Sequence, residues 1–306
     1  MDSTKRFETP ILFITFRRPG TTKRVFDVIR HLKPAKLYVA QNYCDDKKPE
    51  IIENWTSVRN IIENVEWDCE VKKLYRTQYL DAKSSISSAI SWFFKHEPEG
   101  IILEDDCLPD MTFFRFCADL LEKYRNDDRI ASISGNNFQF GRDRTNSSYY
   151  FSRYPHIWGW ASWRRTWNNY DVDMKYWPEI RDSELLSYIL KNKRSLDYWT
   201  EIFNRTYNGE IDTWDYQLTF TCWIQNQLNI IPNKNLVSNI GFGMGATHTK
   251  DICQYANMKT EKMHFPLNHP GYFIQDFISD DFTERHHFSG ESIYSKMKNR
   301  IRELIS

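Results

Sequence analysis

An apolar run, Ile101-Ile102-Leu103, passes directly into three acids, Glu104-Asp105-Asp106. A short continuous apolar run of this kind is typical of a strand buried on both faces. Three adjacent carboxylates repel one another, and their burial is costly unless a cation compensates them. Hard divalent cations bind carboxylate and phosphate oxygens together, so they can supply that compensation. The stretch therefore predicts a buried strand that ends at a site for a metal and a phosphate-containing ligand. The alternative is a solvated turn.

Outward from this stretch, strand-like and helix-like segments alternate through the first half of the chain. This alternation predicts an α/β fold with a mostly parallel sheet flanked by helices. Ligands of such sheets bind beyond the carboxyl ends of the strands, where 15–18, 41–42 and 104–106 are expected to lie. The expected strands cover 11–16, 37–40, 69–75, 100–103 and 129–134, and the expected helices cover 21–32, 50–64, 84–95 and 110–125.

The second half of the chain has a different pattern. Residues 149–176 are crowded with aromatic side chains, and 241–245 is too rich in glycine for a regular element. Helices are expected over 183–191, 195–207 and 214–227, and short strands over 229–231 and 236–238.

The chain shows no internal repeat and no clear linker, so we expect a single domain over 1–290. Its first half, which would hold the phosphate-containing ligand, would cover about 8–135, and a smaller mixed subregion would cover about 136–290. Residues 291–306 are expected to form an amphipathic helix. That helix would dock on the domain or make a peripheral contact with an anionic membrane.

Composition narrows the class of protein. The 306 residues include 41 basic and 41 acidic side chains, so electrostatics give no case for nucleic-acid binding. Six cysteines without a paired spacing suit reduced thiols better than a disulfide framework. The charged N-terminus does not resemble a signal peptide, and no stretch approaches the roughly 20 apolar residues of a membrane helix. We therefore expect a cytoplasmic protein, with the inner membrane face as an alternative location.

An ordered set of motifs carries a family resemblance. It comprises Pro10–Ile14 with an Arg soon after, Gln41-Asn42, Glu104-Asp105-Asp106 followed by Pro109–Phe114, Tyr154–Trp160, Trp214-Asp215 and Ser238–His248. The set resembles the GT-A glycosyltransferases, and more closely the animal N-glycan β-1,2-N-acetylglucosaminyltransferases with their bacterial and viral relatives. The resemblance spans most of 10–250. It implies an enzyme of the GT-A type that uses Mn²⁺ or Mg²⁺ and inverts the anomeric carbon. Such an enzyme would move a sugar from a UDP-sugar to a hydroxyl of a glycan or glycoconjugate.

The resemblance assigns donor-side roles to several residues. Thr15 and Arg17 would lie against the nucleoside and diphosphate, with Arg18 as a neighbour. Asn42 would read the base edge, where the family often has Asp; an amide suits uracil, which offers both a donor and an acceptor. Lys83 would reach phosphate, although a solvated lysine at a helix start is an equal alternative.

Acidic and aromatic residues have expected roles nearer the chemistry. Asp106 would bind the metal, while Asp105 and Glu104 would face ribose or donor-sugar hydroxyls. Asp215 would be the catalytic base, with a helix-capping role as its alternative and Asp212 as a nearby rival. Trp158 and Gly159 would form a wall beside the donor sugar. Thr247 would contact the diphosphate, and His248 would support the diphosphate or bind the metal.

Two other functions remain open on the sequence. A nucleotidyltransferase also joins a parallel sheet to acids and a metal, but Arg17-Arg18-Pro19-Gly20 is a poor version of the phosphate loop it would need. A non-catalytic carbohydrate-binding protein could keep a degenerate transferase fold. The donor sugar is open as well: the resemblance implies GlcNAc, and glucose, galactose and xylose are alternatives.

Overall fold

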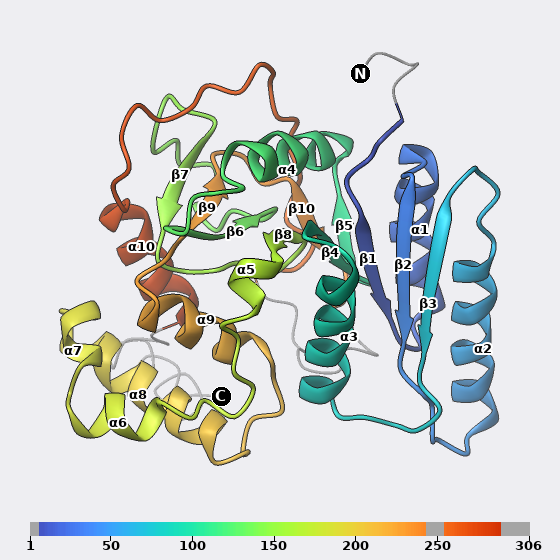
Figure 1. Cartoon of the computed structure of the whole chain (residues 1–306), viewed down its shortest axis with the longest axis horizontal. Helices are drawn as coiled ribbons and strands as arrows, with labels where there is room; N and C mark the ends of the chain where they lie inside the picture. Colours follow the sequence, from blue (N-terminus) through green and yellow to red (C-terminus); the bar gives the residue numbers. More distant parts are fainter. Residues whose placement is uncertain (1–5, 243–253, 289–306) are drawn as a thin grey trace, which may run out of the picture.

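The computed structural model describes residues 6–242 and 254–288 (Figure 1). Eight strands form one sheet in the order β3-β2-β1-β4-β8-β6-β9-β7, and β10 pairs with β5 in a separate ribbon. The strands are β1 (Ile11–Thr15), β2 (Lys36–Gln41), β3 (Glu70–Tyr75), β4 (Glu99–Glu104), β5 (Cys107–Pro109), β6 (Ile130–Ser134), β7 (Tyr149–Ser152), β8 (Trp160–Trp163), β9 (Leu228–Pro232) and β10 (Val237–Asn239).

Helices cover both faces of the sheet (Figure 1). The long helices of the first half follow the expected ranges closely, and α8 does so in the second half. The helices are α1 (Pro19–Leu32), α2 (Pro49–Glu63), α3 (Ala82–His96), α4 (Met111–Lys123), α5 (Arg164–Trp167), α6 (Trp177–Asp182), α7 (Leu186–Ile189), α8 (Lys193–Tyr207), α9 (Asp215–Ile224) and α10 (Phe277–Thr283), with a π-helical turn η1 (Glu284–Phe288).

The strand directions confirm the predicted fold class, an α/β fold with a mostly parallel sheet flanked by helices. β3, β2, β1 and β4 run parallel to one another. β8 then runs antiparallel between β4 and β6, β9 is parallel to β6, and β7 is an antiparallel edge strand. The expected boundary near residue 135 falls between β6 and β7, and strands from both sides of it belong to the same sheet.

Side-chain alternation along the strands builds two cores. In β1, Ile11 and Phe13 join the cluster under α1, α2 and α4, whereas Leu12 and Ile14 join the cluster under α3, α8 and α9. Successive side chains of a strand point to opposite faces, so a strand buried on both sides must be apolar throughout. β1 and most of β4 meet this requirement, which explains why their sequences show no polar alternation.

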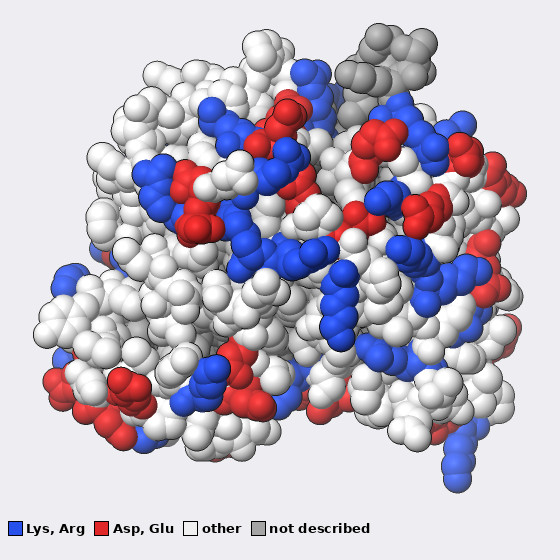
Figure 2. All heavy atoms as spheres, viewed as in Figure 1, with Lys and Arg blue, Asp and Glu red and all other residues white. Residues whose placement is uncertain are grey.

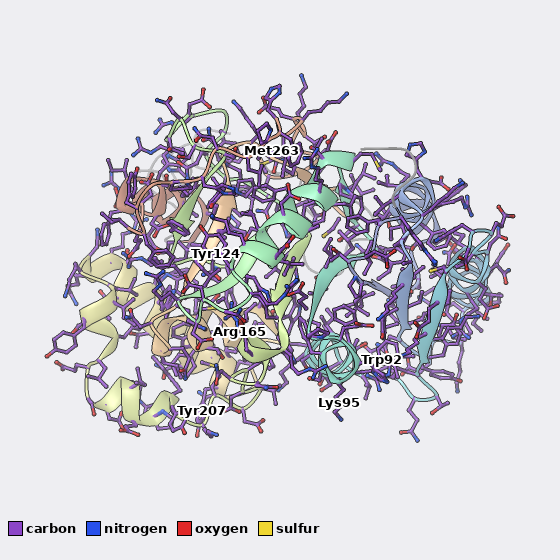
Figure 3. All side chains as sticks on the ribbon, turned by 45° about the horizontal axis from the view of Figure 1, so that its top comes forward. Trp92, Lys95, Tyr124, Arg165, Tyr207 and Met263 are labelled. Carbon is purple, nitrogen blue, oxygen red and sulfur yellow. The ribbon has the colours of Figure 1, made fainter. Side chains whose placement is uncertain are left out.

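Capping and bracing fix the ends of two helices near the site. Asp81 and Asp110 accept hydrogen bonds from backbone N–H groups at the starts of α3 and α4. At the other end of α4, Arg165 donates to the carbonyls of Tyr124 and Arg125 (Figure 3). These bonds satisfy acceptors that a helix end leaves without partners.

The mixture of surface charges agrees with the equal numbers of basic and acidic residues, and the helices agree with the lack of long apolar stretches in the sequence. On the face shown in Figure 2, basic and acidic side chains are interspersed, without a broad patch of one sign. Within residues 6–242 and 254–288, no helix combines the length and the apolar character needed to cross a bilayer. The helix expected over 291–306 lies outside the described residues.

Replacing Gly100 with Ala should destabilise the sheet next to the site. A methyl group on Gly100 would overlap with the ring of Phe93 and lie 2.8 Å from the carbonyl oxygen of Pro10. Because overpacking of a filled core costs typically 1–3 kcal/mol, we expect the free energy of unfolding to fall by about 2 kcal/mol. Urea titration followed by circular dichroism measures this change.

Gly20→Ala is the matched control, since Gly20 is an exposed residue of α1 with nothing within 4 Å of the added methyl. It should raise stability by up to about 1 kcal/mol, the difference in helix propensity between the two residues. Equal effects of the two substitutions would contradict the packing argument.

Candidate active site

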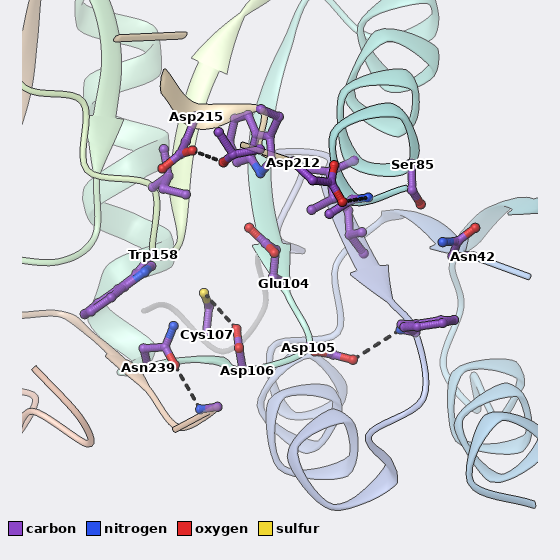
Figure 4. Close-up of a pocket in the computed structure, with 18 of the residues that line it drawn as sticks. Asn42, Ser85, Glu104, Asp105, Asp106, Cys107, Trp158, Asp212, Asp215 and Asn239 are labelled. Carbon is purple, nitrogen blue, oxygen red and sulfur yellow. Dashed lines mark hydrogen bonds between the residues drawn. The ribbon is translucent and has the colours of Figure 1, made fainter. Parts of the chain in front are cut away.

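A cavity of about 500 Å³ opens where the carboxyl ends of β1, β2 and β4 face the start of α9 (Figure 4). The cavity lies where the sequence places the expected ligand site, beyond the carboxyl ends of the strands. Segments far apart in the sequence form its walls. The lining includes Thr15, Phe16, Arg18, Asn42, Tyr79, Leu80, Ser85, Glu104, Asp105, Asp106, Trp158, Asp212, Trp214, Asp215, Tyr216, Gly241, Phe242 and His287.

Strand register explains why the acids meet the residues after β1. In the parallel ladder Ile14 lies beside Glu104 on one side and beside Ala40 on the other. The chain segments that follow these three positions therefore emerge at the same edge of the sheet. The backbone N–H of Phe16 donates to Asp105 Oδ2 at 3.2 Å, which ties the end of β1 to the acidic stretch.

Arg18 is the cation of the acidic stretch. Its Nη2 donates to Asp105 Oδ1 at 2.5 Å, and its Nη1 lies 3.0 Å from Asp106 Oδ2. Burial alone would lower the pKa of the Arg18 guanidinium, but the carboxylates of Asp105 and Asp106 raise it above its usual value. Paired, charge-assisted contacts of this kind hold a planar guanidinium in one orientation. Two of the three carboxylates thus share one positive charge, which balances only one of their two negative charges.

Glu104 has no positive group of its own. Among the described residues no hydrogen bond to its carboxylate is found, and it faces the cavity together with Asp215. Burial, followed by the repulsion of Asp106 and Asp105, raises the pKa of the Glu104 carboxyl well above its usual range. Asp215 contributes to the same shift. The site therefore gathers more carboxyl groups than Arg18 neutralises, and without a further cation Glu104 favours its neutral, protonated form.

This surplus of carboxylate oxygen fits a divalent cation. Within the described ranges, no three His, Cys, Asp or Glu side chains are arranged to hold a metal by themselves. A cation at Asp106 would therefore take further oxygen ligands from water and from a bound phosphate, as Mg²⁺ commonly does. The residues present suit a metal shared with a ligand better than a metal enclosed by the protein.

A short ribbon brings a second chain segment over the acids. β5 follows Asp106 directly and pairs with β10, and the N–H of Ile240 donates to the Asp106 carbonyl at 2.8 Å. Gly241 then lies so close that a side chain there would overlap with the Asp106 carboxylate and crowd Arg18. Only glycine lets the backbone pass at this point. The next segment contains Thr247 and His248, whose expected roles lie outside the described residues.

The structure separates Asp215 from its rival Asp212. The Asp212 carboxylate accepts hydrogen bonds from the N–H groups of Ala82 and Lys83, at 3.0 and 2.8 Å, and so caps α3 from across the cavity. Asp215 lies in the first turn of α9, where its carboxylate accepts a hydrogen bond from the hydroxyl of Thr213. Both acids line the cavity, but the two carboxylate oxygens of Asp212 are already occupied by a structural role.

Asn42 is held by the protein as well. Its Nδ2 donates to the Leu80 carbonyl at 2.7 Å, and its Oδ1 accepts from the N–H groups of Tyr43 and Leu80 at 2.9 and 3.3 Å. These contacts leave the amide with one N–H for a ligand and both lone pairs of its oxygen engaged. Asn42 therefore fixes the Leu80 wall of the cavity, and its role in reading a base stays a prediction limited to donation.

Other expected residues are divided between the cavity and its surroundings. Thr15 lines the cavity, although its hydroxyl donates to the Ala40 carbonyl, and Trp158 lines the opposite wall. Arg17 lies 3.7 Å from Asp46, and neither Arg17 nor Lys83 is among the lining residues. Gly159 has a positive φ of 66° and packs against Val237, so it shapes the wall from behind.

Several lining residues had no functional assignment from the sequence. Tyr79, Leu80, Tyr216 and His287 belong to this group. Tyr79 and Leu80 come just before α3, a position that a strand–helix alternation marks as a strand-end loop. Nothing in the local sequence of His287 separates it from His286, because its place depends on the packing of η1 against the rest of the chain.

The stability of the fold should depend on pH through His156, which packs edge-on against Phe138 at this end of the molecule. Burial, and secondarily His287, lowers the pKa of His156 from 6.5 to about 3. Between about pH 3 and pH 6.5, His156 is protonated in the unfolded chain and neutral in the folded chain. The free energy of unfolding is therefore unaffected by His156 above pH 6.5 and decreases as pH falls below that value. We expect a loss of up to about 1.4 kcal/mol per pH unit.

Urea titrations of wild type and His156→Gln at pH 7, 6 and 5 measure this dependence. The variant cannot titrate at this position, so its stability relative to wild type should improve steadily as pH falls. A constant difference across the three pH values would show that His156 does not carry the effect.

Comparisons with known proteins give a fold likeness and no family. No protein-family model matches the chain, and a search of curated proteins gives no match. Among solved structures, mouse xyloside xylosyltransferase 1 shares 12% identity, with 74% of this chain and 84% of that chain covered and a TM-score of 0.37. HddC from Yersinia pseudotuberculosis shares 10% identity, with 51% of this chain and 77% of that chain covered and a TM-score of 0.31. A UDP-glucose pyrophosphorylase complexed with UDP-glucose shares 11% identity, with 49% of this chain and 64% of that chain covered and a TM-score of 0.29. At these values, the argument for a function rests on the site itself.

Proposed function

We propose that this protein is an inverting, metal-dependent glycosyltransferase that moves a sugar from a UDP-sugar to a hydroxyl of a glycan or glycoconjugate. The observation that carries the proposal is the arrangement of acids around one cavity. Glu104, Asp105 and Asp106 lie at the strand ends, and Asp215 lies on the α9 side of the same space (Figure 4). A volume of about 500 Å³ is in the range of pockets that hold small ligands and cofactors.

The donor would lie along the length of the cavity. Figure 4 places Asn42 at one end and Trp158 at the other, with the acids between them. The nucleoside would take the end with Asn42, where the rings of Phe16 and Tyr79 line the wall and the free N–H of the amide can donate to a base carbonyl. The diphosphate would then lie over Arg18 and Asp106, and the sugar would reach toward Trp158.

Asp215 would act as the general base. As the acceptor oxygen attacks the anomeric carbon, its proton passes to the Asp215 carboxylate, and the bond between that carbon and the diphosphate oxygen breaks. The electron pair of the broken bond leaves with UDP. Because the acceptor oxygen attacks from the face opposite the leaving diphosphate, the configuration at the anomeric carbon is inverted. A divalent cation held at Asp106 would neutralise charge on the leaving diphosphate. Arg18, placed between the acids and the cavity, can add a positive charge beside it.

The enzyme class is tested by nucleotide binding and by the product released. Calorimetry with UDP, GDP and CMP, each with and without Mn²⁺, should show binding of UDP that depends on the metal. Incubation with UDP-sugars should then release UDP. Release of pyrophosphate from a nucleoside triphosphate and a sugar phosphate would instead indicate a nucleotidyltransferase. Failure of all three nucleotides to bind with metal would refute both and favour a carbohydrate-binding protein.

A further inference from the structure

His287 lies at the Trp158 end of the cavity, far along the chain from every other lining residue. It belongs to η1, the π-helical turn that continues α10, and π-helical turns occur frequently at functional sites. Nothing in the amino-acid sequence distinguishes it from its neighbour His286. The structure distinguishes the two residues by what surrounds their rings.

Aromatic side chains hold the ring of His287 in place. Its centroid lies 4.4 Å from that of Phe138, 4.7 Å from Tyr255 and 4.5 Å from Phe288. Phe138 in turn packs edge-on against Trp158 at 5.0 Å. With neighbours of this kind on several sides the imidazole has little freedom to rotate, so the direction of its ring nitrogens is fixed by the fold.

Unequal surroundings of the two ring nitrogens indicate where the proton lies. Nδ1 of His287 is buried without a hydrogen-bond partner, whereas Nε2 is not enclosed in that way. Burial lowers the pKa of His287 to about 4, so the ring is neutral near pH 7 and carries one proton. A buried N–H without an acceptor is rarer than a buried acceptor without a donor. The favoured tautomer therefore has the proton on Nε2, where it can be donated to a ligand.

The position of His287 indicates which part of a ligand it meets. His287 shares the Phe138 and Trp158 cluster, and Trp158 lies at the opposite end of the cavity from Asn42 (Figure 4). A nucleoside bound near Asn42 is therefore remote from His287. The part of a UDP-sugar that reaches the Trp158 end is the sugar, whose hydroxyl and carbonyl oxygens accept hydrogen bonds.

We propose that His287 binds the donor sugar by donating the hydrogen of Nε2 to one of its oxygen atoms. This inference rests on the proposed function and adds a specificity-determining residue that the motif-bearing part of the chain does not contain. It assigns His287 to sugar recognition and leaves nucleotide binding to the strand-end residues.

Paired binding measurements with and without the sugar test the proposal. Dissociation constants for UDP, and for UDP-GlcNAc, UDP-glucose, UDP-galactose and UDP-xylose, are measured by calorimetry with Mn²⁺. His287→Phe keeps an aromatic ring in the cluster and removes the donor, so it should weaken the preferred UDP-sugar about tenfold and leave UDP unchanged. His287→Gln keeps an N–H donor and should stay within about threefold of wild type.

His286→Phe is the matched control on the next residue. The His286 ring stacks on Phe282 and is bonded through Nδ1 to the Phe282 carbonyl, and it does not line the cavity. This substitution should change neither UDP nor UDP-sugar binding. Melting temperatures of all variants establish that each is folded.

Four results would overturn the proposal. Equal losses for UDP and the UDP-sugar in His287→Phe, or no loss for either, would exclude a contact specific to the sugar. Nitrogen-15 NMR of the imidazole, which needs no ligand, would do so by finding the proton on Nδ1. Absence of UDP binding in wild type would refute the proposed function itself, and with it this inference, so the two failures are distinguishable.

Discussion

Replacing Asp215 with Asn is expected to lower kcat about 10²–10⁴-fold while the affinity for UDP stays within about twofold of wild type. The range is the usual contribution of a general base, and an amide of nearly the same shape cannot accept the proton. Asp215 lies on the α9 wall of the cavity, away from the residues near Asn42, so nucleotide binding should be spared. The measurements are the rate of UDP release from the preferred UDP-sugar and the dissociation constant of UDP.

Asp212→Asn is the control, because the two acids are neighbours in sequence and line the same cavity. Asp212 holds two N–H groups of α3 with its two carboxylate oxygens, and an amide keeps only one of these acceptors. The replacement should therefore lower stability by about 1 kcal/mol and kcat by less than about tenfold. A larger loss of kcat in Asp212→Asn than in Asp215→Asn would reverse the assignment of the base.

Replacing Asp106 with Ala is expected to remove the effect of Mn²⁺ on UDP binding and to weaken UDP about 100-fold in the presence of the metal. Substitution of a residue that hydrogen-bonds to a metal ligand typically lowers metal affinity or activity about 10–100-fold. Substitution of the ligand itself should therefore cost about 100-fold or more. The change also releases Nη1 of Arg18 from its partner 3.0 Å away. Calorimetry of UDP binding, with and without Mn²⁺, gives both quantities.

Glu99→Gln is the control for Asp106→Ala because Glu99 begins the same strand, β4, that ends at the acidic stretch. Its carboxylate pairs with Arg125 at the surface, where ion pairs contribute at most about 1 kcal/mol. UDP binding and its dependence on Mn²⁺ should be unchanged. If Asp106→Ala retained metal-dependent binding, the cation would have to be held elsewhere.

The sequence predicts the first half of the fold well because its elements obey simple periodicities. β1 and β4 are apolar along nearly their whole length, and α1 to α4 follow each strand with an amphipathic face. The strands β5, β7 and β8 were missed, since each has only three or four residues and β7 and β8 lie in the aromatic stretch. Trp160 and Trp163 are strand residues here, but their spacing alone does not separate strand from loop.

The chemistry of the site is predicted less completely than its location. The sequence identifies Asn42, but it does not reveal that Leu80 and Tyr43 engage most of the amide. Arg17 and Arg18 are adjacent, and only the turn into α1 determines that Arg18 faces the acids. These details depend on which partners the tertiary structure brings within hydrogen-bond distance, and a one-dimensional pattern holds no record of those distances.

The bond between Asp212 and the start of α3 crosses from one wall of the cavity to the other, and this gives the molecule a built-in reporter. The amide protons of Ala82 and Lys83 are held by a carboxylate more than a hundred residues away in the chain. They can exchange with solvent deuterium when the segment 211–213 separates from α3. The exchange rates of these two protons thus record how often the walls part, in the free protein and with any ligand bound.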